Sequence, residues 1–355
     1  SAKVQTDIHF FNKKFSGGHT YKGFSVPGTG QMAPGKPEVP GFARWILIPN
    51  GTTASISTSQ GTPVVYKNIN LAPVQQDSYA SFGAPLPPIC KNEKIYNSDT
   101  DFPGVFAEIE PVKYKRGQSC TILWIYPYQY NPVQKTLKVY PDLNVIVTFT
   151  GNIEPIPANL KSAHLIKSLK SMAINADAVL NAEENAGNGL KETEIVKSDG
   201  CELLIITHPN FEGAATKLAS WKIRRGIYTQ VVTTNVTGST SAEIETYIDN
   251  AYSTWSPAPE YLLFFGDAEF VPTCYRTYHP SGGNQDTIGT DFYYADFDEA
   301  ADYIAEFGYG RLSVDSVNQA NTIVERIISY ERTPTTNPDF YSNILNIAMF
   351  QDGEG

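Results

Sequence analysis

The stretch EYLLFFGDAEFVP, residues 260–272, decides how the second half of this chain folds. Its aromatic and aliphatic run from Tyr261 to Phe265 predicts a buried strand that ends at Gly266-Asp267. Further along lies TDFYYADFDEAADYIAEFGYGRL, residues 290–312, and seven acidic residues fall between Asp286 and Glu306 with no Lys or Arg among them. A buried strand that ends in a carboxylate near such a concentration of acid predicts either a site for a hard cation or the rim of a catalytic site.

Strands and helices alternate on both sides of this stretch. Predicted strands are 202–207, 228–234, 261–267 and 343–350, and predicted helices are 211–225, 241–255 and 318–330. Gly226 follows the first helix in the position that glycine favours, and Ser241 is a credible N-cap for the second. Strands that alternate with helices predict an α/β domain with a mostly parallel sheet.

The first half of the chain has a different pattern. Short runs rich in Val, Ile, Tyr, Phe and Thr, separated by Gly, Pro, Asn and Asp, predict strands at 42–49, 62–69, 120–130, 135–140 and 143–151. This pattern favours a β-rich sandwich or a related barrel, followed by a helical stretch at 160–181. The polar segment 181–200 is typical of a linker. We therefore predict a β-sandwich domain at 1–180 and an α/β domain at 201–355.

Composition excludes several classes of protein. The net charge of −10 leaves no basic stripe for nucleic acid, and no apolar run approaches the roughly 20 residues that span a bilayer. The four cysteines form no CxxC pair, which disfavours a zinc knuckle. Cys90 and Cys120 could form a disulfide in an exported protein, although isolated buried thiols are the more common arrangement.

Several blocks of sequence resemble the gingipain family of secreted cysteine peptidases. DFPG (101–104) followed by YPYQYNPVQKTLKVY (126–140) is similar to the family's propeptide. LLIITHPNFEGAATKLASWKIRRGIYTQVV (203–232), YLLFFGD (261–267) and the GYGRL…YER segment (308–332) are similar to the start of its catalytic domain. The resemblance implies a caspase-like α/β fold, protein or peptide substrates, a secreted or cell-surface location, and a zymogen whose β-rich prodomain keeps the enzyme latent.

The resemblance also implies a structural Ca²⁺ site. Its side-chain ligands would be Asp267, Asp302 and Glu306, with main-chain carbonyl groups near Glu299 and Ile304 completing the shell. Ca²⁺ takes 6–8 oxygen ligands, so the chemistry suits the residues. Asp296 and Asp298 are alternative ligands, and a solvated acidic loop without any ion is the alternative reading of the whole cluster.

The catalytic nucleophile and base are expected elsewhere. The family uses a Cys and the His of a His-Gly segment, whereas this sequence has no His-Gly and no Cys after Cys274. We therefore expect both beyond Gly355, on a covalent continuation or a second chain, so that this chain alone lacks the nucleophile. The family's His-orienting acid aligns with Gln351, which makes the neighbouring Asp352 a candidate for that role or simply a frayed terminal residue. We expect a structural role for His208, and we treat Cys274 with His279 as a chance pair.

Two further expectations concern the first half. The Pro-rich segment 77–94 falls where the resemblance places the propeptide's inhibitory loop, and an ordinary surface loop is the alternative. A second function class remains open, namely a non-catalytic exported adhesion or carbohydrate-binding protein with a calcium-stabilised module. A nucleotide-binding protein is disfavoured because no Gly-rich phosphate loop follows Thr207.

Overall fold

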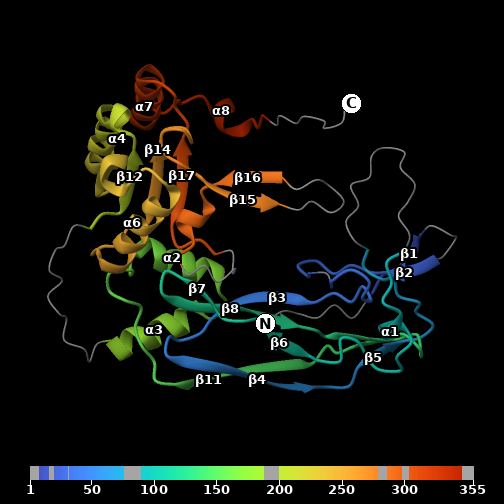
Figure 1. Ribbon diagram of the computed structural model, residues 1–355. Helices are drawn as coiled ribbons and strands as arrows, with labels where there is room; N and C mark the ends of the chain where they lie inside the picture. Colours follow the sequence, from blue (N-terminus) through green and yellow to red (C-terminus); the bar gives the residue numbers. More distant parts are fainter. Residues whose placement is uncertain are drawn as a thin grey trace. The chain divides into compact units, whose positions relative to one another are not determined.

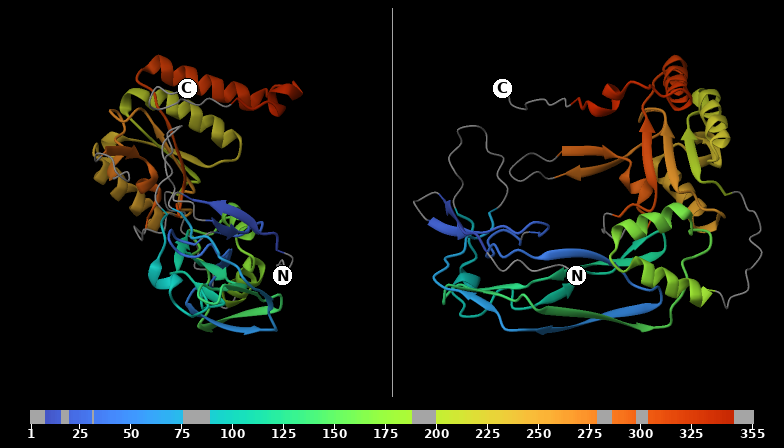
Figure 2. Two further views of the ribbon diagram at one scale, coloured as in Figure 1. Left: turned by 90° about the vertical axis from the view of Figure 1, so that its right-hand side faces the viewer. Right: turned by 180° about the vertical axis from the view of Figure 1, so that it is seen from behind.

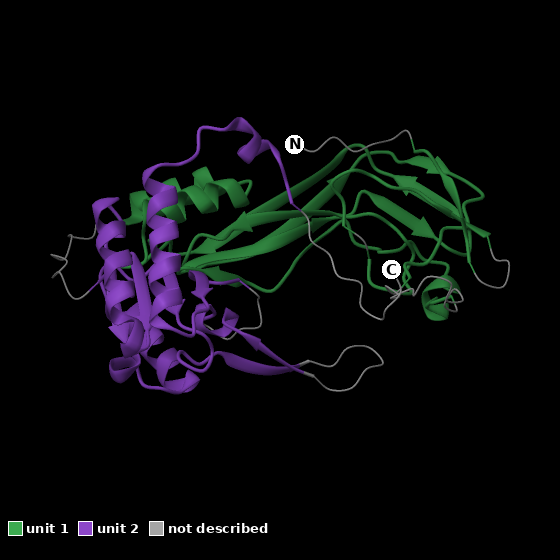
Figure 3. Ribbon diagram, turned by 90° about the horizontal axis from the view of Figure 1, so that it is seen from above, with its two compact units in different colours: residues 1–193 green, residues 194–355 purple. Residues whose placement is uncertain are grey.

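The computed structural model describes residues 8–15, 20–30, 32–75, 89–187, 200–278, 286–297 and 304–345. The chain divides into two compact units, residues 1–193 and residues 194–355 (Figure 3). The division falls inside the segment 181–200 that the sequence predicts as a linker. No helix in the described ranges is both long and apolar enough to cross a membrane.

Unit 1 is built from short antiparallel strands, which confirms the β-rich prediction (Figure 1). Its paired strands form four small sheets with the orders β1-β2, β5-β10-β9, β11-β4 and β3-β8-β6, and β7 also pairs with β8. The strands are β1 Phe11–Lys14, β2 Thr20–Gly23, β3 Phe42–Leu47, β4 Thr52–Gln60, β5 Val64–Tyr66, β6 Ala107–Ile109, β7 Lys113–Lys115, β8 Gln118–Ile125, β9 Tyr128–Asn131, β10 Thr136–Val139 and β11 Leu143–Gly151. Its helices are α1 Glu93–Tyr96, α2 Ala163–Met172 and α3 Ala176–Gly187.

The core of unit 1 lies where β9 and β10 pack against the chain around Leu71. Tyr128, Tyr130, Leu137 and Leu71 are fully buried in one cluster. The phenol of Tyr130 accepts a hydrogen bond from the Leu71 N–H at 3.1 Å, so this large side chain is buried with its polar end paired. The aromatic content of the first half therefore forms a packed core.

Three expectations for unit 1 need correction. The nine-residue strand β4 was not predicted because Ser and Thr dominate it; it forms through nine register pairs with β11. The predicted strand 120–130 is two strands, β8 and β9. The helical stretch 160–181 is also two helices, because Ala173 takes an extended conformation between α2 and α3.

The second of these helices enters the predicted linker. α3 continues to Gly187, so residues 181–187 are helical, and residues 188–199 lie outside the described part. Glu183 accounts for this difference: its side chain is buried and accepts a hydrogen bond from the Asn50 N–H at 2.8 Å. The polar composition of residues 181–200 gives no sign of this contact between Glu183 and Asn50.

Unit 2 contains a parallel sheet, as predicted, with the order β13-β12-β14-β17, although β17 was not among the predicted strands. Its strands are β12 Leu203–Thr207, β13 Thr229–Thr233, β14 Tyr261–Phe265 and β17 Gly308–Leu312, and an antiparallel ribbon of β15 Cys274–Tyr278 and β16 Asp286–Thr290 projects from the sheet (Figure 1). Its helical segments are η2 Pro209–Phe211, α4 Glu212–Arg224, α5 Thr234–Thr237, α6 Ser241–Thr254, η3 Phe292–Ala295, α7 Val317–Arg332 and α8 Pro338–Ser342.

Helices cover both faces of this sheet. On one face, α4 and α7 lie side by side (Figure 2), and their buried residues Leu218 and Val324 share a core with Ile205 and Phe265. Side chains alternate along a strand, so Phe264 points to the other face, where its ring packs against Tyr294 at 4.8 Å. The unit is therefore a three-layer α/β arrangement.

The helix ends of unit 2 largely follow the sequence. Gly226 has φ +86 and ends α4 as predicted. The N-cap of α6 is Thr240 and not Ser241, because Thr240 and Glu243 form a reciprocal capping box. The predicted strand 343–350 is not seen in its described part: residues 343–345 follow α8 without strand pairing, and Ile344 is 84% exposed. Residues 346–350 lie outside the description.

Candidate functional site

The carboxyl edge of the parallel sheet gathers the polar residues that follow its strands. In the sheet register, Thr207 lies beside Phe265, and Phe265 lies beside Leu312. His208 and Asp267, which come directly after β12 and β14, therefore lie at the same edge of the sheet. Open α/β sheets place their binding sites at this edge.

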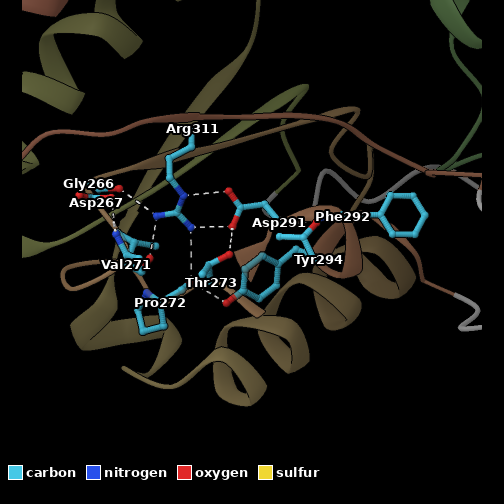
Figure 4. Close-up of polar contacts among 11 residues, drawn as sticks. Gly266, Asp267, Val271, Pro272, Thr273, Asp291, Phe292, Tyr294 and Arg311 are labelled. Carbon is cyan, nitrogen blue, oxygen red and sulfur yellow. Dashed lines mark hydrogen bonds and ion pairs between the residues drawn. The ribbon is translucent and has the colours of Figure 1, made fainter. Parts of the chain in front are cut away.

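An ion pair between Arg311 and Asp291 dominates the contacts at this edge (Figure 4). The Arg311 Nε donates to Asp291 Oδ2 at 2.8 Å, and Nη2 donates to Asp291 Oδ1 at 2.7 Å. Each side chain is only 13% exposed. The pair is therefore a mostly buried, two-bond contact, which is the strongest geometry available to an Arg and a carboxylate.

Arg311 also holds the loop that follows β14. Its Nη1 donates to the carbonyl oxygens of Gly266 at 2.9 Å and Val271 at 2.7 Å, and Nη2 donates to Pro272 at 3.4 Å. A guanidinium has five N–H donors, and all five are used here. Gly266 has φ +140, a left-handed backbone that suits glycine, where the chain leaves the strand.

Two neighbouring side chains add hydrogen bonds around the ion pair. Thr273 Oγ1 donates to Asp291 Oδ1 at 2.8 Å, and the Tyr294 hydroxyl donates to the Pro272 carbonyl at 2.7 Å. Burial raises the pKa of Tyr294 well above its ordinary value, so this phenol remains a donor. The Arg311 guanidinium lies 5.3 Å from the centre of the Phe264 ring. The motif GYGRL did not reveal this role of Arg311 in the sequence; the available signal was a lone Arg within a short run of Gly, Tyr and Leu.

Asp267 itself has a local role in this loop. Its Oδ1 accepts the N–H of Ala268 at 2.8 Å, and its carbonyl accepts the N–H groups of Phe270 and Val271, both at 2.9 Å. Its own N–H donates to Val314 at 3.2 Å. These contacts fold residues 267–271 into a turn and fasten that turn to the end of β17.

Glu306 lies at the other end of the same strand pair. Gly308, two residues later, donates its N–H to Glu260 at the start of β14, whereas Asp267 bonds Val314 at the end. β17 alone covers four residue steps from Gly308 to Leu312, or ~13 Å at ~3.3 Å per residue, and the two carboxylates lie beyond its opposite ends. Asp267 and Glu306 cannot ligate one ion, so the predicted ligand set is wrong in joining them. The resemblance was mapped along the sequence, whereas the parallel register sends the two carboxylates to opposite edges.

Two buried carboxylates remain together at the Glu306 end. Glu306 is 4% exposed and Asp296 is 7% exposed. The Glu306 N–H donates to Ala295 at 2.8 Å, and Glu306 Oε2 accepts the N–H of Phe297 at 3.0 Å, so Glu306 bonds both chain neighbours of Asp296. Ile304 is half-buried nearby in sequence, while Glu299 and Asp302 lie outside the described residues. Within the described ranges, no group of three or more His, Cys, Asp or Glu side chains is arranged to hold a metal.

The other candidate residues occupy varied positions. His208 caps η2, with Nδ1 accepting the Asn210 N–H at 3.2 Å, and its ring packs against Phe270 at 5.3 Å, as a structural residue would. All four cysteines are free thiols, so the Cys90–Cys120 disulfide is absent. Asp352, Gln351, Asp298 and His279 lie outside the described residues.

The Pro-rich segment 77–94 is described only from residue 89 onwards. Its base is closed by one side chain. Gln75 Oε1 accepts the Cys90 N–H at 2.9 Å, and Gln75 Nε2 donates to the Cys90 carbonyl at 3.1 Å. Gln75 and Cys90 are therefore held together in unit 1.

Comparison with known families gives two matches in sequence order. Residues 9–179 match the model of Propeptide_C25, and residues 197–355 match the model of peptidase family C25. The two matched ranges follow the two compact units closely, with the gap between them at the unit boundary.

Individual relatives come from Porphyromonas gingivalis. Lys-gingipain W83 is 26% identical over 349 residues, which cover 93% of this chain and 19% of the relative. A gingipain R2 is 24% identical over 368 residues, covering 99% of this chain and 46% of the relative. The chain thus spans about a fifth of the Lys-gingipain and less than half of the gingipain R2.

Solved structures with similar parts are also known. A complex of the RgpB pro- and mature domains matches at 21% identity with a TM-score of 0.41, covering 49% of this chain and 90% of the matched chain. A gingipain K structure described in terms of zymogenic latency matches at 25% identity with a TM-score of 0.36, covering 42% of this chain and 84% of the matched chain. Assignment of the chain rests on the sequence matches.

Proposed function

Because the chain belongs to the gingipain family, peptidase family C25, we propose that it is the precursor part of a cysteine endopeptidase that its own prodomain keeps latent. One observation carries this proposal: the propeptide and the peptidase families match in that order, on two separate compact units. Unit 1 would be the prodomain. Unit 2 would be the first part of the catalytic domain, with protein or peptide substrates.

In this proposal the described part of unit 2 positions the site and does not supply the nucleophile. Reactive cysteines need a stabilised thiolate. Burial instead raises the pKa of Cys201 to about 12 and raises that of Cys274. We therefore propose that the nucleophilic Cys and its His partner come from a segment that follows Gly355, joined to this chain or separate from it. Asp352 would orient that His.

The five hydrogen bonds of Arg311 would hold the carboxyl edge of the sheet in place next to that catalytic Cys and His. A peptidase site holds its reacting groups within a fraction of an ångström, and flexible loops are poor supports for such precision. Arg311 ties the loop after β14 to Asp291 and to the edge strand, so the rim cannot shift independently of the sheet.

A structural Ca²⁺ is the second part of the proposal. Burying two adjacent carboxylates raises their electrostatic energy, and a cation between them offsets this cost. The oxygen atoms of Asp296 and Glu306 suit Ca²⁺, and the Ile304 carbonyl, Asp302 and Glu299 would complete the shell. When bound, the ion would supply a cross-link between the acidic segment and the start of β17.

Latency would come from the Pro-rich segment 77–94. Gln75 closes its base, so unit 1 presents the segment from a fixed stem, as a cleft-blocking loop requires. Similarity to gingipains and the net charge of −10 also support export of this chain to the cell surface or the medium.

Thiol labelling of the purified precursor tests the assignment. The precursor is cut by limited proteolysis between the units and then treated with a biotinylated alkylating probe, and the labelled peptides are identified by mass spectrometry. We expect rapid labelling of a cysteine outside the four of this chain, only after the cut, with slow labelling of half-exposed Cys90 as background. Labelling confined to Cys90, before and after the cut, would count against a peptidase.

A further inference from the structure

A buried glutamate and a buried glutamine meet inside unit 1. Glu183 on α3 is 2% exposed, and Gln118, the first residue of β8, is fully buried. Gln118 Nε2 donates to Glu183 Oε1 at 3.2 Å, and the same Glu183 oxygen accepts the Asn50 N–H at 2.8 Å. The two side chains therefore face each other, end to end, between a helix and a sheet.

Each side chain has one oxygen that this arrangement leaves without a partner. Within the described structure, Glu183 Oε2 and Gln118 Oε1 are both buried and have no hydrogen-bond partner. The Gln118 amide cannot be turned round, because its Nε2 also donates to the carbonyls of Ile48 at 3.0 Å and Ser119 at 3.2 Å. Two acceptors are thus buried without a donor, and an unsatisfied buried acceptor costs about 1–3 kcal/mol.

A carboxylate can only accept hydrogen bonds, whereas a carboxylic acid carries a donor. We propose that Glu183 is a carboxylic acid in the folded chain, with its Oε2–H donating to Gln118 Oε1. The two side chains then form a cyclic acid–amide pair with one hydrogen bond in each direction. A single bound proton satisfies both remaining oxygen atoms and fastens α3 to β8.

The surroundings favour the proton. Burial is the largest influence and raises the pKa of Glu183 above its ordinary value of 4.5. The Asn50 N–H, Gln118 and the charge of Lys161 act in the opposite direction but are smaller. The adjoining segments also carry charged residues, namely Arg44 on β3, Lys115 on β7, Arg116 before β8, Glu154 after β11, and Asp177 and Glu184 on α3, and none of them is among the groups that shift this pKa.

The pair fastens the end of α3, the last helix of unit 1 that the structure describes. At the start of α3, Asn175 forms hydrogen bonds with both the N–H and the carbonyl of Leu47, each at 2.8 Å, and an asparagine side chain does not titrate. Near its end, Glu183 is the anchor, four residues before Gly187 and close to the boundary between the units. The end of α3 should therefore loosen as the pH rises through the raised pKa of Glu183. Any effect on cleavage between the units rests on the proposed zymogen function, whereas the pair itself does not.

Hydrogen exchange of α3 in the full chain tests the pair. At pH values between the ordinary pKa of 4.5 and the raised pKa, Glu183 is protonated when α3 is closed and ionised when α3 is open. The protection factors of the α3 amides should therefore fall about tenfold per pH unit in this range. Glu183→Gln keeps both hydrogen bonds with an amide, so its protection factors should stay constant over that window. The matched control is Glu184→Gln, because Glu184 is the exposed neighbour on the same helix and its variant should behave like the wild type.

Infrared spectroscopy gives a second, direct reading. The wild type labelled with ¹³C-glutamate should show the carbonyl band of a protonated acid that persists above pH 4.5, the ordinary pKa of glutamate, and Glu183→Gln should lose it. Absence of that band, together with lower α3 protection in Glu183→Gln at every pH, would overturn the proposal and mark Glu183 as a carboxylate. If Glu183→Gln loses the band but cleavage between the units does not change, the acid–amide pair is supported. That result would count only against a link between the pair and activation.

Discussion

Arg311 and Asp291 form two hydrogen bonds of 2.8 and 2.7 Å. This contact joins β17, the edge strand of the parallel sheet, to the residue that follows β16 in the ribbon. The remaining N–H groups of Arg311 bind the three carbonyls of the loop after β14. One side chain therefore connects three segments that are far apart in sequence. Its loss should affect the whole carboxyl edge.

Arg311→Ala should destabilise unit 2 by about 3–5 kcal/mol, because it leaves Asp291 buried without its cation. Arg311→Lys should restore only part of this loss, since an ammonium cannot reproduce the two-bond contact. Thermal unfolding measures both changes. The control is Arg276→Lys, at an exposed Arg that only covers the Tyr293 ring at 3.9 Å. Equal melting temperatures for Arg311→Ala and the control would contradict the assigned role.

The capping box of α6 gives a smaller, local prediction. Thr240→Ala removes the acceptor for the Glu243 N–H and should cost about 1 kcal/mol of unfolding free energy. Ser241→Ala, one position later, should change stability by only a few tenths of a kcal/mol. Denaturant unfolding compares the two variants. The reverse order would restore Ser241 as the cap.

Acid should loosen the contact between α4 and α7 at Glu331. Although burial raises its pKa, hydrogen bonds from Lys222 at 2.5 Å and Trp221 at 2.8 Å lower it below the ordinary value of 4.5 overall. The stability from this contact is present above pH 4.5 and is lost as the pH falls through the lowered pKa. Glu331→Gln should therefore be less stable than the wild type at pH 7, with the difference shrinking towards pH 3. A pH-independent difference in melting temperature would argue against this ion pair.

Calcium should stabilise unit 2 through Asp296 and Glu306. At a free concentration of 100 times the dissociation constant, one site adds about 2.7 kcal/mol, and a chelator should remove it. Glu306→Gln should abolish the response of the melting temperature to Ca²⁺, whereas Glu269→Gln, at an exposed residue, should retain it. Asp267→Asn should also retain it, because Asp267 lies at the other end of the strand pair. A lost response in Asp267→Asn would contradict the register of β14 and β17 described above.

Local sequence patterns predicted most of unit 2. Buried parallel strands such as β12 and β14 are continuous apolar runs, and Gly226 marks the end of α4, so periodicity and glycine position are sufficient there. The ribbon of β15 and β16 was missed because exposed residues such as Tyr275 and Thr277 carry no burial pattern. β4 was missed for a related reason, since its pairing with β11 depends on a partner some 90 residues away, as in the pair Ser55–Thr148.

The candidate site was harder to predict than the fold. An acidic cluster was evident in the sequence, but which carboxylates meet depends on strand register, and this separates Asp267 from Glu306. The Arg311–Asp291 pair spans 20 residues and is defined by the carbonyl groups it holds, which leave no trace in side-chain composition. Similarly, Glu183 lay in a polar stretch that gave no sign of its burial against Gln118.

Peptidase activity of the intact and the cut precursor, including the segment that we propose follows Gly355, tests the central claim most directly. A general protein substrate such as casein avoids any assumption about cleavage specificity. We predict negligible activity before the units are separated, activity after a cut between them, and complete loss of that activity on thiol alkylation. Absence of thiol-dependent activity after the cut, or equal activity before it, would contradict the account of this chain as the latent precursor of a cysteine peptidase.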